Sequence, residues 1–457
     1  MFRKTIKRLP SQQSNRTDPP MISWLLNIVY LALVVAASPF LVWSAVTKGK
    51  YREGFAEKFL GQLPSRPVDS AQHLWLHAVS VGEVNLLAPL MQAIGQAHPG
   101  TTFHITTTTK AGYDLAKTKY AEHIVSYAPL DFSWAVSNAY RRIQPDAVLL
   151  AELELWPNLI RFAQRHSAHI AIINGRLSSK SHRGYRRILW LVRPLLRRLD
   201  LIAAQDETYA ARFCDLGADP QNVHVTGSIK FDGITPNRNN PQSLAFRELA
   251  GLQADDLVWL AGSTQAGEEP LILAAYHQAQ KQVPNLKLLL VPRHPHRFDE
   301  IAHYLTAQGE HFARRSELNE PLSAEVSILL IDSVGELSAW WGTADIAFVG
   351  GSLGNRGGQN MIEPAAYGAA VAVGPNTWNF KDVVQRLQAA EALTVIHDTD
   401  SLAQFVLHAA TDHVWRLDQG ERAKEVVLAQ QGATARSVAL LAPLLQRPTI
   451  VKFRSAA

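Results

Sequence analysis

The length of the chain, 457 residues, exceeds that of a typical single-core domain and predicts two domains of roughly 200 residues each. Hydrophobic residues make up 47% of the chain and charged residues 19%, a composition that excludes a largely disordered protein. The formal net charge of +5 is compatible with anionic lipids or acidic small substrates. The basic residues are dispersed and form no recognisable nucleic-acid-binding motif, so we expect no nucleic-acid partner.

Cysteine and histidine usage argues against a metal centre. Cys214 is the only cysteine, which excludes an internal disulfide and a cysteine-rich zinc site and fits a reducing compartment. The 17 histidines show no HxxxH or comparable ligand spacing. We therefore expect neither a metal nor another cofactor.

Residues 21–46 form an uncharged hydrophobic segment that follows a basic arm, residues 1–20. The segment is long enough to cross a hydrocarbon core, which takes roughly 20 residues. A buried core helix is the alternative, but such helices usually carry a polar face, and this segment shows none. Basic residues flank the segment on both sides, so the positive-inside rule does not decide its orientation, and a helix lying flat on an anionic leaflet fits equally well. We predict a membrane anchor that either spans the membrane or lies on it.

After the anchor, apolar stretches rich in β-branched residues alternate with amphipathic stretches. These apolar stretches are 73–80, 101–109, 146–154, 169–178 and 201–206, followed by 257–264, 286–293, 326–333, 345–352, 369–375 and 392–398. The alternation predicts two doubly wound α/β domains of the Rossmann-like type, over residues 47–231 and 247–445, with a polar linker at 232–246 and a tail at 446–457. Such sheets bind ligands at the carboxyl ends of their strands, so we expect the active site in a cleft that both domains face.

A candidate general base lies after the first predicted strand. The run Ser80-Val81-Gly82-Glu83 ends this strand and opens a helix, which places Glu83 at the helix N-terminus. The helix dipole would keep a carboxylate ionised there, as a base requires. A first-turn glutamate that only stabilises its helix explains the spacing equally well. His77, in the strand itself, is interpreted as a packed histidine.

Two further segments of the first half contain charged residues that could take part in catalysis. Glu152 and Glu154 alternate by two in AELELWPN, so both are predicted to point to one face at a strand end, where one could hold an acceptor hydroxyl or a cation. A solvated strand end is the alternative. Lys230 in TGSIKFD is expected where the two halves meet, and it would suit a negatively charged donor or transition state.

A basic cluster follows the fourth strand of this half. Its members are Arg176, Lys180, Arg183, Arg186 and Arg187. They could bind phosphate or lipid headgroups, and the alternative is the solvated basic face of a helix. If alanine at Arg183, Arg186 and Arg187 left binding to phosphorylated lipid unchanged, the first explanation would fail.

In the second half, candidate ligand-binding residues follow several predicted strands. Pro292 and Arg293 end one strand, and Arg293 could bind a phosphate with two hydrogen bonds. The turn Val334-Gly335-Glu336 precedes a predicted helix whose N–H groups could receive a phosphate or base. A glycine-rich loop that begins at Gly350 would allow close approach to a ligand, and it leads to Asn360 and Glu363, of which the latter could accept hydrogen bonds from ribose hydroxyls.

Eight stretches of the chain, in order, resemble the motifs of bacterial 3-deoxy-D-manno-octulosonic acid (Kdo) transferases. They read LHAVSVGEV, AELELWPNLI, NGRLS, TGSIKFD, AGSTQAGEE, VPRHPHR, DSVGEL and GGQNMIEPAAYG. The likeness extends from near the anchor almost to the C-terminus, and eight ordered motifs are more specific than any single one.

The resemblance implies a GT-B fold and an inverting, metal-independent transfer of Kdo from CMP-Kdo to a lipid A precursor of the lipid IVA type. It implies an enzyme of the inner membrane whose catalytic domains face the cytoplasm and contact an anionic leaflet. It also implies the residue roles: Glu83 as the base, Glu152 rather than Glu154 together with Lys230 as stabilisers of the transition state, and a CMP site. That site would comprise Pro292, Arg293, Val334, Gly335, Glu336, Asn360 and Glu363.

Two positions depart from the family's pattern. Gln359 and Gln265 stand where the family usually or often has histidine. Glutamine cannot carry a proton at neutral pH, so cationic help to the donor phosphate from these positions is in doubt. A third difference, Gly175 in NGRLS, is minor.

Three other functions are compatible with parts of the pattern. A GT-B enzyme that uses a UDP-sugar is one, because the fold does not choose the nucleotide. A Rossmann dehydrogenase is disfavoured because no G-x-G-x-x-G follows the first strand of either half. A non-catalytic membrane scaffold would not need Glu83 or Arg293.

Overall fold

The computed structural model describes residues 20–48, 53–68, 70–234, 237–323 and 325–446. Within them the contacts divide the chain into two compact units, Met1–Gly227 with Thr434–Ala457, and Ser228–Ala433. We call these unit 1 and unit 2. The division falls near the predicted boundaries, but it assigns the C-terminal helix to unit 1. The predicted basic arm and nearly all of the predicted tail lie outside the described residues.

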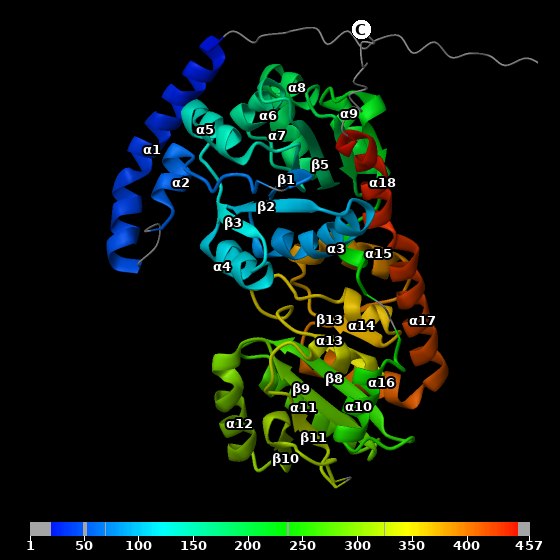
Figure 1. Cartoon of the computed structure of the whole chain (residues 1–457). Helices are drawn as coiled ribbons and strands as arrows, with labels where there is room; N and C mark the ends of the chain where they lie inside the picture. Colours follow the sequence, from blue (N-terminus) through cyan, green and yellow to red (C-terminus); the bar gives the residue numbers. More distant parts are fainter. Residues whose placement is uncertain (1–19, 49–52, 69, 235–236, 324, 447–457) are drawn as a thin grey trace, which may run out of the picture. The chain divides into compact units, whose positions relative to one another are not determined.

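Unit 1 contains a seven-stranded parallel sheet in the order β3-β2-β1-β4-β5-β6-β7. The strands are β1 (Gln72–His77), β2 (Thr101–Thr107), β3 (Ile124–Tyr127), β4 (Ala147–Ala151), β5 (His169–Gly175), β6 (Leu201–Ala204) and β7 (Val223–Val225). The helices are α1 (Pro20–Lys48), α2 (Phe55–Leu60), α3 (Val81–Ala97), α4 (Lys110–Lys119), α5 (Ser133–Ile143), α6 (Pro157–Arg165), α7 (Ser179–Arg187), α8 (Leu189–Leu196), α9 (Glu207–Asp215) and α18 (Ala433–Leu445). Helices α3 and α4 lie on one face of the sheet, and α5, α6 and α8 on the other (Figure 1). The predicted doubly wound fold of this half is confirmed.

Unit 2 contains a second seven-stranded parallel sheet, in the order β10-β11-β9-β8-β12-β13-β14. The strands are β8 (Leu257–Thr264), β9 (Leu286–Pro292), β10 (Phe312–Arg314), β11 (Ile328–Leu330), β12 (Ile346–Val349), β13 (Ala370–Val373) and β14 (Thr394–Val395). The helices are α10 (Pro241–Leu249), α11 (Glu269–Gln280), α12 (Phe298–Ala307), α13 (Leu337–Trp340), α14 (Ile362–Ala366), α15 (Lys381–Ala389), α16 (Thr399–Thr411) and α17 (His413–Gln430).

The core of unit 2 explains why its strands are apolar throughout rather than alternating. Val258 and Leu260 of β8 pack into one buried cluster, whereas Trp259 and Ala261 pack into a second cluster on the opposite face. A sheet that is covered by helices on both faces must be apolar on both faces. Most strands of unit 1 are buried in the same way.

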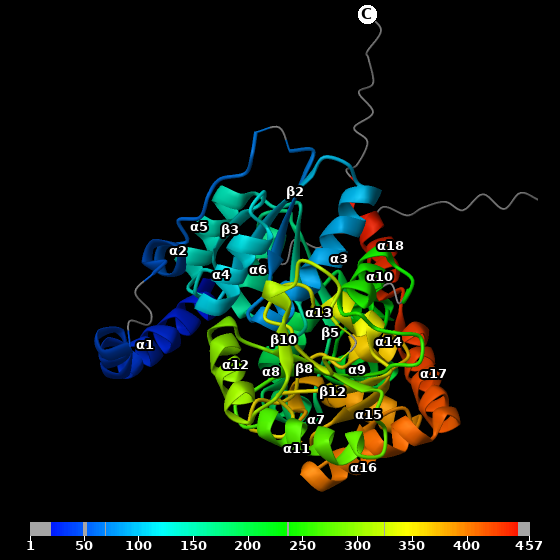
Figure 2. The same ribbon diagram turned by 90° about the horizontal axis from the view of Figure 1, so that it is seen from below.

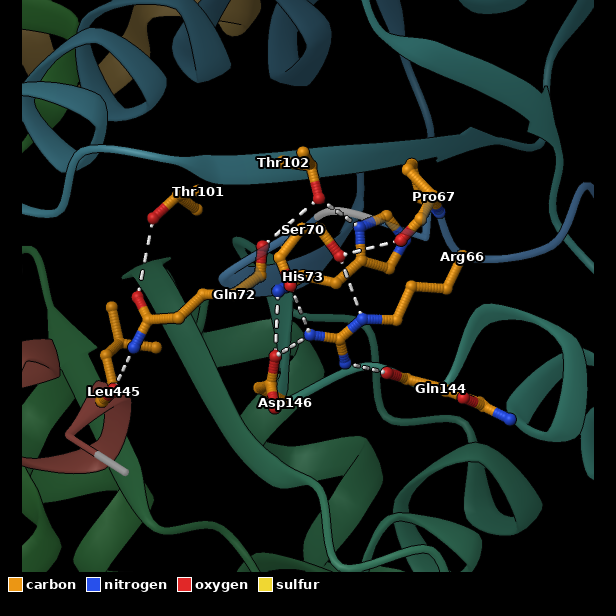
Figure 3. A network of polar contacts seen from close by, with 10 residues as sticks. All are labelled: Arg66, Pro67, Ser70, Gln72, His73, Thr101, Thr102, Gln144, Asp146 and Leu445. Atoms are coloured by element: carbon orange, nitrogen blue, oxygen red, sulfur yellow. Dashed lines mark hydrogen bonds and ion pairs between the residues drawn. The ribbon is translucent and has the colours of Figure 1, made fainter. Parts of the chain in front are cut away.

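A polar network closes the amino ends of the strands in unit 1 (Figure 3). Arg66 donates to Oδ2 of Asp146 at 2.9 Å, and the same carboxylate oxygen accepts the backbone N–H of His73 at 2.8 Å. The side-chain amide of Gln72 donates to the carbonyl of Leu445 at the end of α18. This network joins the C-terminal helix to the edge of the sheet opposite the one where parallel sheets bind ligands.

Helix α1 contains the segment Ile22–Phe40, which by length and composition could cross a membrane; no other helix among the described residues meets that test. Most of its apolar side chains are exposed, Trp24 to 67%, whereas Ser23 and Asn27 are each only 5% exposed. Figures 1 and 2 both show α1 beside α2 and α5. The prediction that this segment has no polar face is wrong, because a narrow polar stripe packs on unit 1 and leaves the apolar surface outside.

Candidate active site

Glu83 lies in the first turn of α3, directly after β1. The N-terminal residue of this turn is Ser80, whose hydroxyl caps the helix by accepting the N–H of Glu83. In return, the Ser80 hydroxyl donates to Oε1 of Glu83 at 2.9 Å, and the N–H of Val79 donates to Oε2 at 2.8 Å. Both carboxylate oxygens are therefore held in a defined orientation at the carboxyl end of β1.

Two opposing effects set the proton affinity of this carboxylate. Burial raises the pKa of Glu83 and the negative charge of Glu152 raises it further, whereas the hydrogen bonds from Val79 and Ser80 lower it. The net shift is upward. A raised pKa makes the carboxylate a stronger proton acceptor, which suits general-base catalysis.

Glu152 and Glu154 lie close to Glu83, but not in the way predicted. Strand β4 ends at Ala151, and Glu152 has a φ of 55°, so the alternation of a strand does not apply to the two residues. The left-handed backbone is fixed because the N–H of Glu152 donates to the carbonyl of Ile173 at 2.9 Å. The prediction of two side chains projecting from one face of a strand is therefore wrong. Such a conformation costs a non-glycine residue about 1–3 kcal/mol and often marks a functional segment.

Glu154 completes what we call the acidic cluster, Glu83, Glu152 and Glu154. Burial raises the pKa of Glu154 to about 7, and the charges of Glu83 and Glu152 add to this effect, while a hydrogen bond from Nε1 of Trp156 at 2.7 Å opposes it. Among the described residues, no group of three or more His, Cys, Asp or Glu side chains is placed to hold a metal ion. The raised pKa means that Glu154 keeps its proton to a higher pH than an exposed glutamate does.

The corresponding edge of unit 2 carries positive charge. Arg293 follows β9, its N–H donates to the carbonyl of Thr264 at 3.0 Å, and its side chain is exposed. The pKa of His294 is lowered first by burial and then by nearby positive charges, those of Arg293 and Arg356 among them. We call Arg293 and Arg356 the cationic edge. Arg356 belongs to the glycine-rich loop after β12, which brings a second arginine near the first.

The turn Val334-Gly335-Glu336 follows β11 in the same sheet. The carboxylate of Glu336 is engaged inside unit 2, because Arg315 binds it with two hydrogen bonds of 2.9 and 3.1 Å and the Ser333 hydroxyl donates to it at 2.6 Å. Gly335 adopts a φ of 88°, and Val334 is 75% exposed. The helix after the turn, α13, has only four residues. The side chain of Val334 is therefore accessible to a ligand, whereas the carboxylate of Glu336 is engaged in stabilising the conformation of the turn.

Asn360 and Glu363 lie together at the start of α14. The side-chain amide of Asn360 donates to Oε1 of Glu363 at 2.9 Å, and its oxygen accepts the N–H of Ile362 at 3.1 Å. Burial raises the pKa of Glu363, against the lowering effect of its hydrogen bonds from Asn360 and Ser338. Because Ser338 belongs to α13, the start of α14 and the turn after β11 are neighbours.

Comparisons with known proteins agree with this geometry. Residues 51–233 match the family described as 3-deoxy-D-manno-octulosonic-acid transferase (kdotransferase). The chain is 33% identical to the 3-deoxy-D-manno-octulosonic acid transferase of Haemophilus influenzae, over 92% of this chain and 98% of that protein. It is also 33% identical to the Bordetella pertussis enzyme of the same name, over 90% of this chain and 97% of that protein. The chain belongs to the Kdo transferase family.

The fold agrees with this assignment. A crystal structure described as a putative UDP-N-acetylglucosamine 2-epimerase from Listeria monocytogenes is similar with a TM-score of 0.53 at 14% identity, covering 81% of this chain and 96% of that one. At that identity the likeness shows only the fold, which is GT-B, as predicted. The protein is thus a glycosyltransferase of the Kdo transferase family with two Rossmann-like domains.

In this Kdo transferase the backbone N–H groups of the glycine-rich loop bind the side chain of Glu268, a residue that the sequence did not single out. The carboxylate of Glu268 accepts the backbone N–H groups of Gln265, Gly351, Ser352 and Leu353 at 2.8–3.1 Å. N–H groups that could have bound an anion therefore bind an internal carboxylate. The adjacent glutamates in AGSTQAGEE were visible in the sequence. The sequence could not show that Glu268 binds a loop more than 80 residues away.

The remaining predicted residues lie elsewhere on the two units. Lys230 is half-buried in the 3-10 turn Ile229–Phe231, at the start of unit 2. The side chains of Lys180, Arg183 and Arg187 are exposed on α7, and Nε of Arg186 lies 3.8 Å from Oδ2 of Asp215. Pro292 is buried at the end of β9.

Proposed function

We propose that this Kdo transferase moves Kdo from CMP-Kdo to a hydroxyl group of a lipid A precursor of the lipid IVA type, with inversion at the anomeric carbon and without a metal. The acceptor oxygen attacks the anomeric carbon as Glu83 takes its proton, and the bond to the CMP phosphate breaks with its electron pair leaving on CMP. One base and a stabilised leaving phosphate suffice for such an inverting transfer.

The observation that carries this proposal is the orientation of Glu83 inside the acidic cluster. Ser80 and Val79 fix both of its oxygens, and burial with the charge of Glu152 raises its pKa. A carboxylate so placed is already aimed and basic before a substrate binds. We assign Glu152 to the tuning of Glu83 and, with Lys230, to stabilisation of the transition state.

We assign the donor to the carboxyl edge of unit 2. CMP-Kdo carries a phosphate and a sugar carboxylate, and two arginines, Arg293 and Arg356, can each form charge-assisted hydrogen bonds with one of them. Pro292, the backbone of Val334 and Gly335, and Asn360 with Glu363 would hold the nucleoside, and Glu336 would keep the turn in shape. In this proposal unit 1 is the acceptor domain and unit 2 the nucleotide-sugar domain.

We also propose that α1 anchors the enzyme to the inner membrane, with both units on the cytoplasmic side. The exposed apolar side chains of α1, among them Trp24, Leu33 and Phe40, support this, because a helix in water would not present them. The basic cluster around Arg183 supplies cations that an anionic leaflet or a phosphorylated acceptor could bind.

The direct test uses the full-length protein in detergent with a tetraacylated lipid A precursor and, in separate reactions, CMP-Kdo or a panel of UDP-sugars. We expect a Kdo-bearing lipid by mass spectrometry and stoichiometric CMP release with CMP-Kdo alone. Transfer from a UDP-sugar, with no product from CMP-Kdo, would overturn the donor assignment.

A further inference from the structure

Asn27 and Tyr30 of α1 bind the start of α5 and the residue Asp131 just before it. Asn27 and Ser133 exchange two hydrogen bonds, from the Asn27 amide to the Ser133 hydroxyl at 2.7 Å and from the Ser133 N–H back to Asn27 at 2.9 Å. One turn further on, the Tyr30 hydroxyl donates to Oδ2 of Asp131 at 3.0 Å. Asn27 and Tyr30 lie three positions apart, so they share one face of the helix.

Asp131 connects this stripe to a second helix. Its side chain is buried, and its carboxylate accepts the N–H groups of Asn158 and Leu159, both at 2.9 Å. These are free N–H groups in the first turn of α6, whose own N-terminal residue, Trp156, provides no side-chain cap. Asp131 therefore caps α6 from another part of the chain, and Tyr30 holds Asp131 in place.

Helix α6 begins directly after residues 152–156, the segment that contains two members of the acidic cluster. Residues 152–156 run from Glu152 through Glu154 to Trp156, and the indole of Trp156 donates to Glu154. A small cavity of about 30 Å³ is lined by Asp131 and Trp156 together with His77, at the end of β1. Hydrogen bonds, together with the backbone of residues 156–158, thus connect the apolar helix to the acidic cluster.

We propose that Tyr30 and Asp131 are positioning residues for the transfer reaction: by capping α6 they hold segment 152–156, so the membrane helix is a working part of the acceptor domain and not only an anchor. The inference rests on the proposed function for its consequence in catalysis. Its structural part, that Tyr30 restrains segment 152–165, can be tested independently of any substrate.

The first test measures hydrogen exchange by mass spectrometry on the full-length protein in detergent. Tyr30→Phe removes one hydrogen bond and keeps the ring, so peptides within residues 152–165 should exchange about fivefold faster, the effect of a bond worth about 1 kcal/mol. Tyr276→Phe is the matched control, because the buried Tyr276 hydroxyl donates to the carbonyl of Leu286 in unit 2. Unchanged exchange in 152–165 for Tyr30→Phe would overturn the inference.

The second test measures steady-state kinetics of the same proteins. Tyr30→Phe should raise the KM for the lipid acceptor about threefold to tenfold and leave the KM for CMP-Kdo unchanged, whereas Tyr276→Phe should leave the acceptor KM unchanged. Asp131→Asn, which presents an amide where two N–H groups need an acceptor, should have the larger effect in the same direction. Faster exchange with an unchanged acceptor KM would overturn the positioning role. Absence of Kdo transfer by the wild type would instead refute the proposed function, and the exchange result would still stand.

Discussion

Each unit contains a seven-stranded parallel sheet, and the carboxyl edges of the two sheets differ in charge. In unit 1 the strand ends after β1 and β4 bring together the carboxylates of Glu83, Glu152 and Glu154. In unit 2 the ends of β9 and β12 bring together Arg293, His294 and Arg356. In both sheets these residues lie just after the carboxyl ends of strands. The fold therefore sets their location, and the loop residues set the charge. Our proposal therefore assigns the proton acceptor to the first edge and the anionic donor to the second.

The largest expected effect comes from the acidic edge. Glu83→Gln keeps the size of the side chain and can still bind Val79 and Ser80, but it cannot take a proton. We expect kcat to fall about 10²- to 10⁴-fold, with CMP affinity by calorimetry equal to that of the wild type. A variant that retained wild-type kcat would remove Glu83 from the mechanism.

A substitution at the cationic edge should weaken donor binding, whereas the substitution at Glu83 should lower kcat and leave CMP binding unchanged. Arg356→Gln removes one proposed charge-assisted partner of the donor, and we expect CMP-Kdo to bind about ten- to a hundredfold more weakly. Lys281→Gln is the control, because Lys281 is exposed at the C-terminal end of α11, at the other edge of the same sheet. Binding of CMP alone then tells the two anionic groups apart: if CMP-Kdo is weakened and CMP is not, Arg356 binds the sugar carboxylate. Equal donor affinity for Arg356→Gln and Lys281→Gln would contradict this part of the proposal.

A smaller effect should show the coupling inside the acidic cluster. The negative charge of Glu152 raises the pKa of Glu83, and transfer needs Glu83 ionised, so the rate should rise with pH as Glu83 loses its proton. Glu152→Gln removes the like charge and should move this rise to lower pH, measured as the acid limb of the kcat profile. A limb that stays in place, or moves to higher pH, would show that the two carboxylates do not interact.

The smallest effect concerns stability rather than rate. Burial raises the pKa of Glu154 to about 7, above the usual value of 4.5, so its contribution to stability is present at low pH and is lost as pH rises through about 7. Glu154→Gln can keep the hydrogen bond from Trp156 without the charge. We expect its Tm to exceed that of the wild type by about 2 °C or more at pH 8 and to match it at pH 5. An equal difference at both pH values would assign the effect to packing.

The sequence predicted what depends on neighbouring residues. The alternation of buried strands and amphipathic helices is local, and it predicted both doubly wound units. The spacing of Ser80 and Glu83 is a local helix-start pattern, and it led to the first turn of α3. Their catalytic roles, like those of the other candidate residues, stay predictions.

The sequence could not predict contacts between distant segments. Glu268 binds a loop more than 80 residues away, Arg315 binds Glu336 from another strand end, and Asp131 caps a helix that begins at Pro157. The left-handed backbone of Glu152 depends on Ile173 of β5, so alternation failed there. In α1, the roles of Asn27 and Tyr30 follow only from their contacts with Ser133 and Asp131, which lie about 100 residues away.

The central claim is that Glu83 accepts the proton of the attacking hydroxyl during Kdo transfer. Single-turnover transfer at saturating CMP-Kdo and lipid acceptor, followed by mass spectrometry across pH for the wild type and Glu83→Gln, tests it most directly. We predict a wild-type rate that rises with pH and a Glu83→Gln rate that is slow and lacks this rise. The same pH-dependent rise in both proteins would contradict the account and place the base elsewhere.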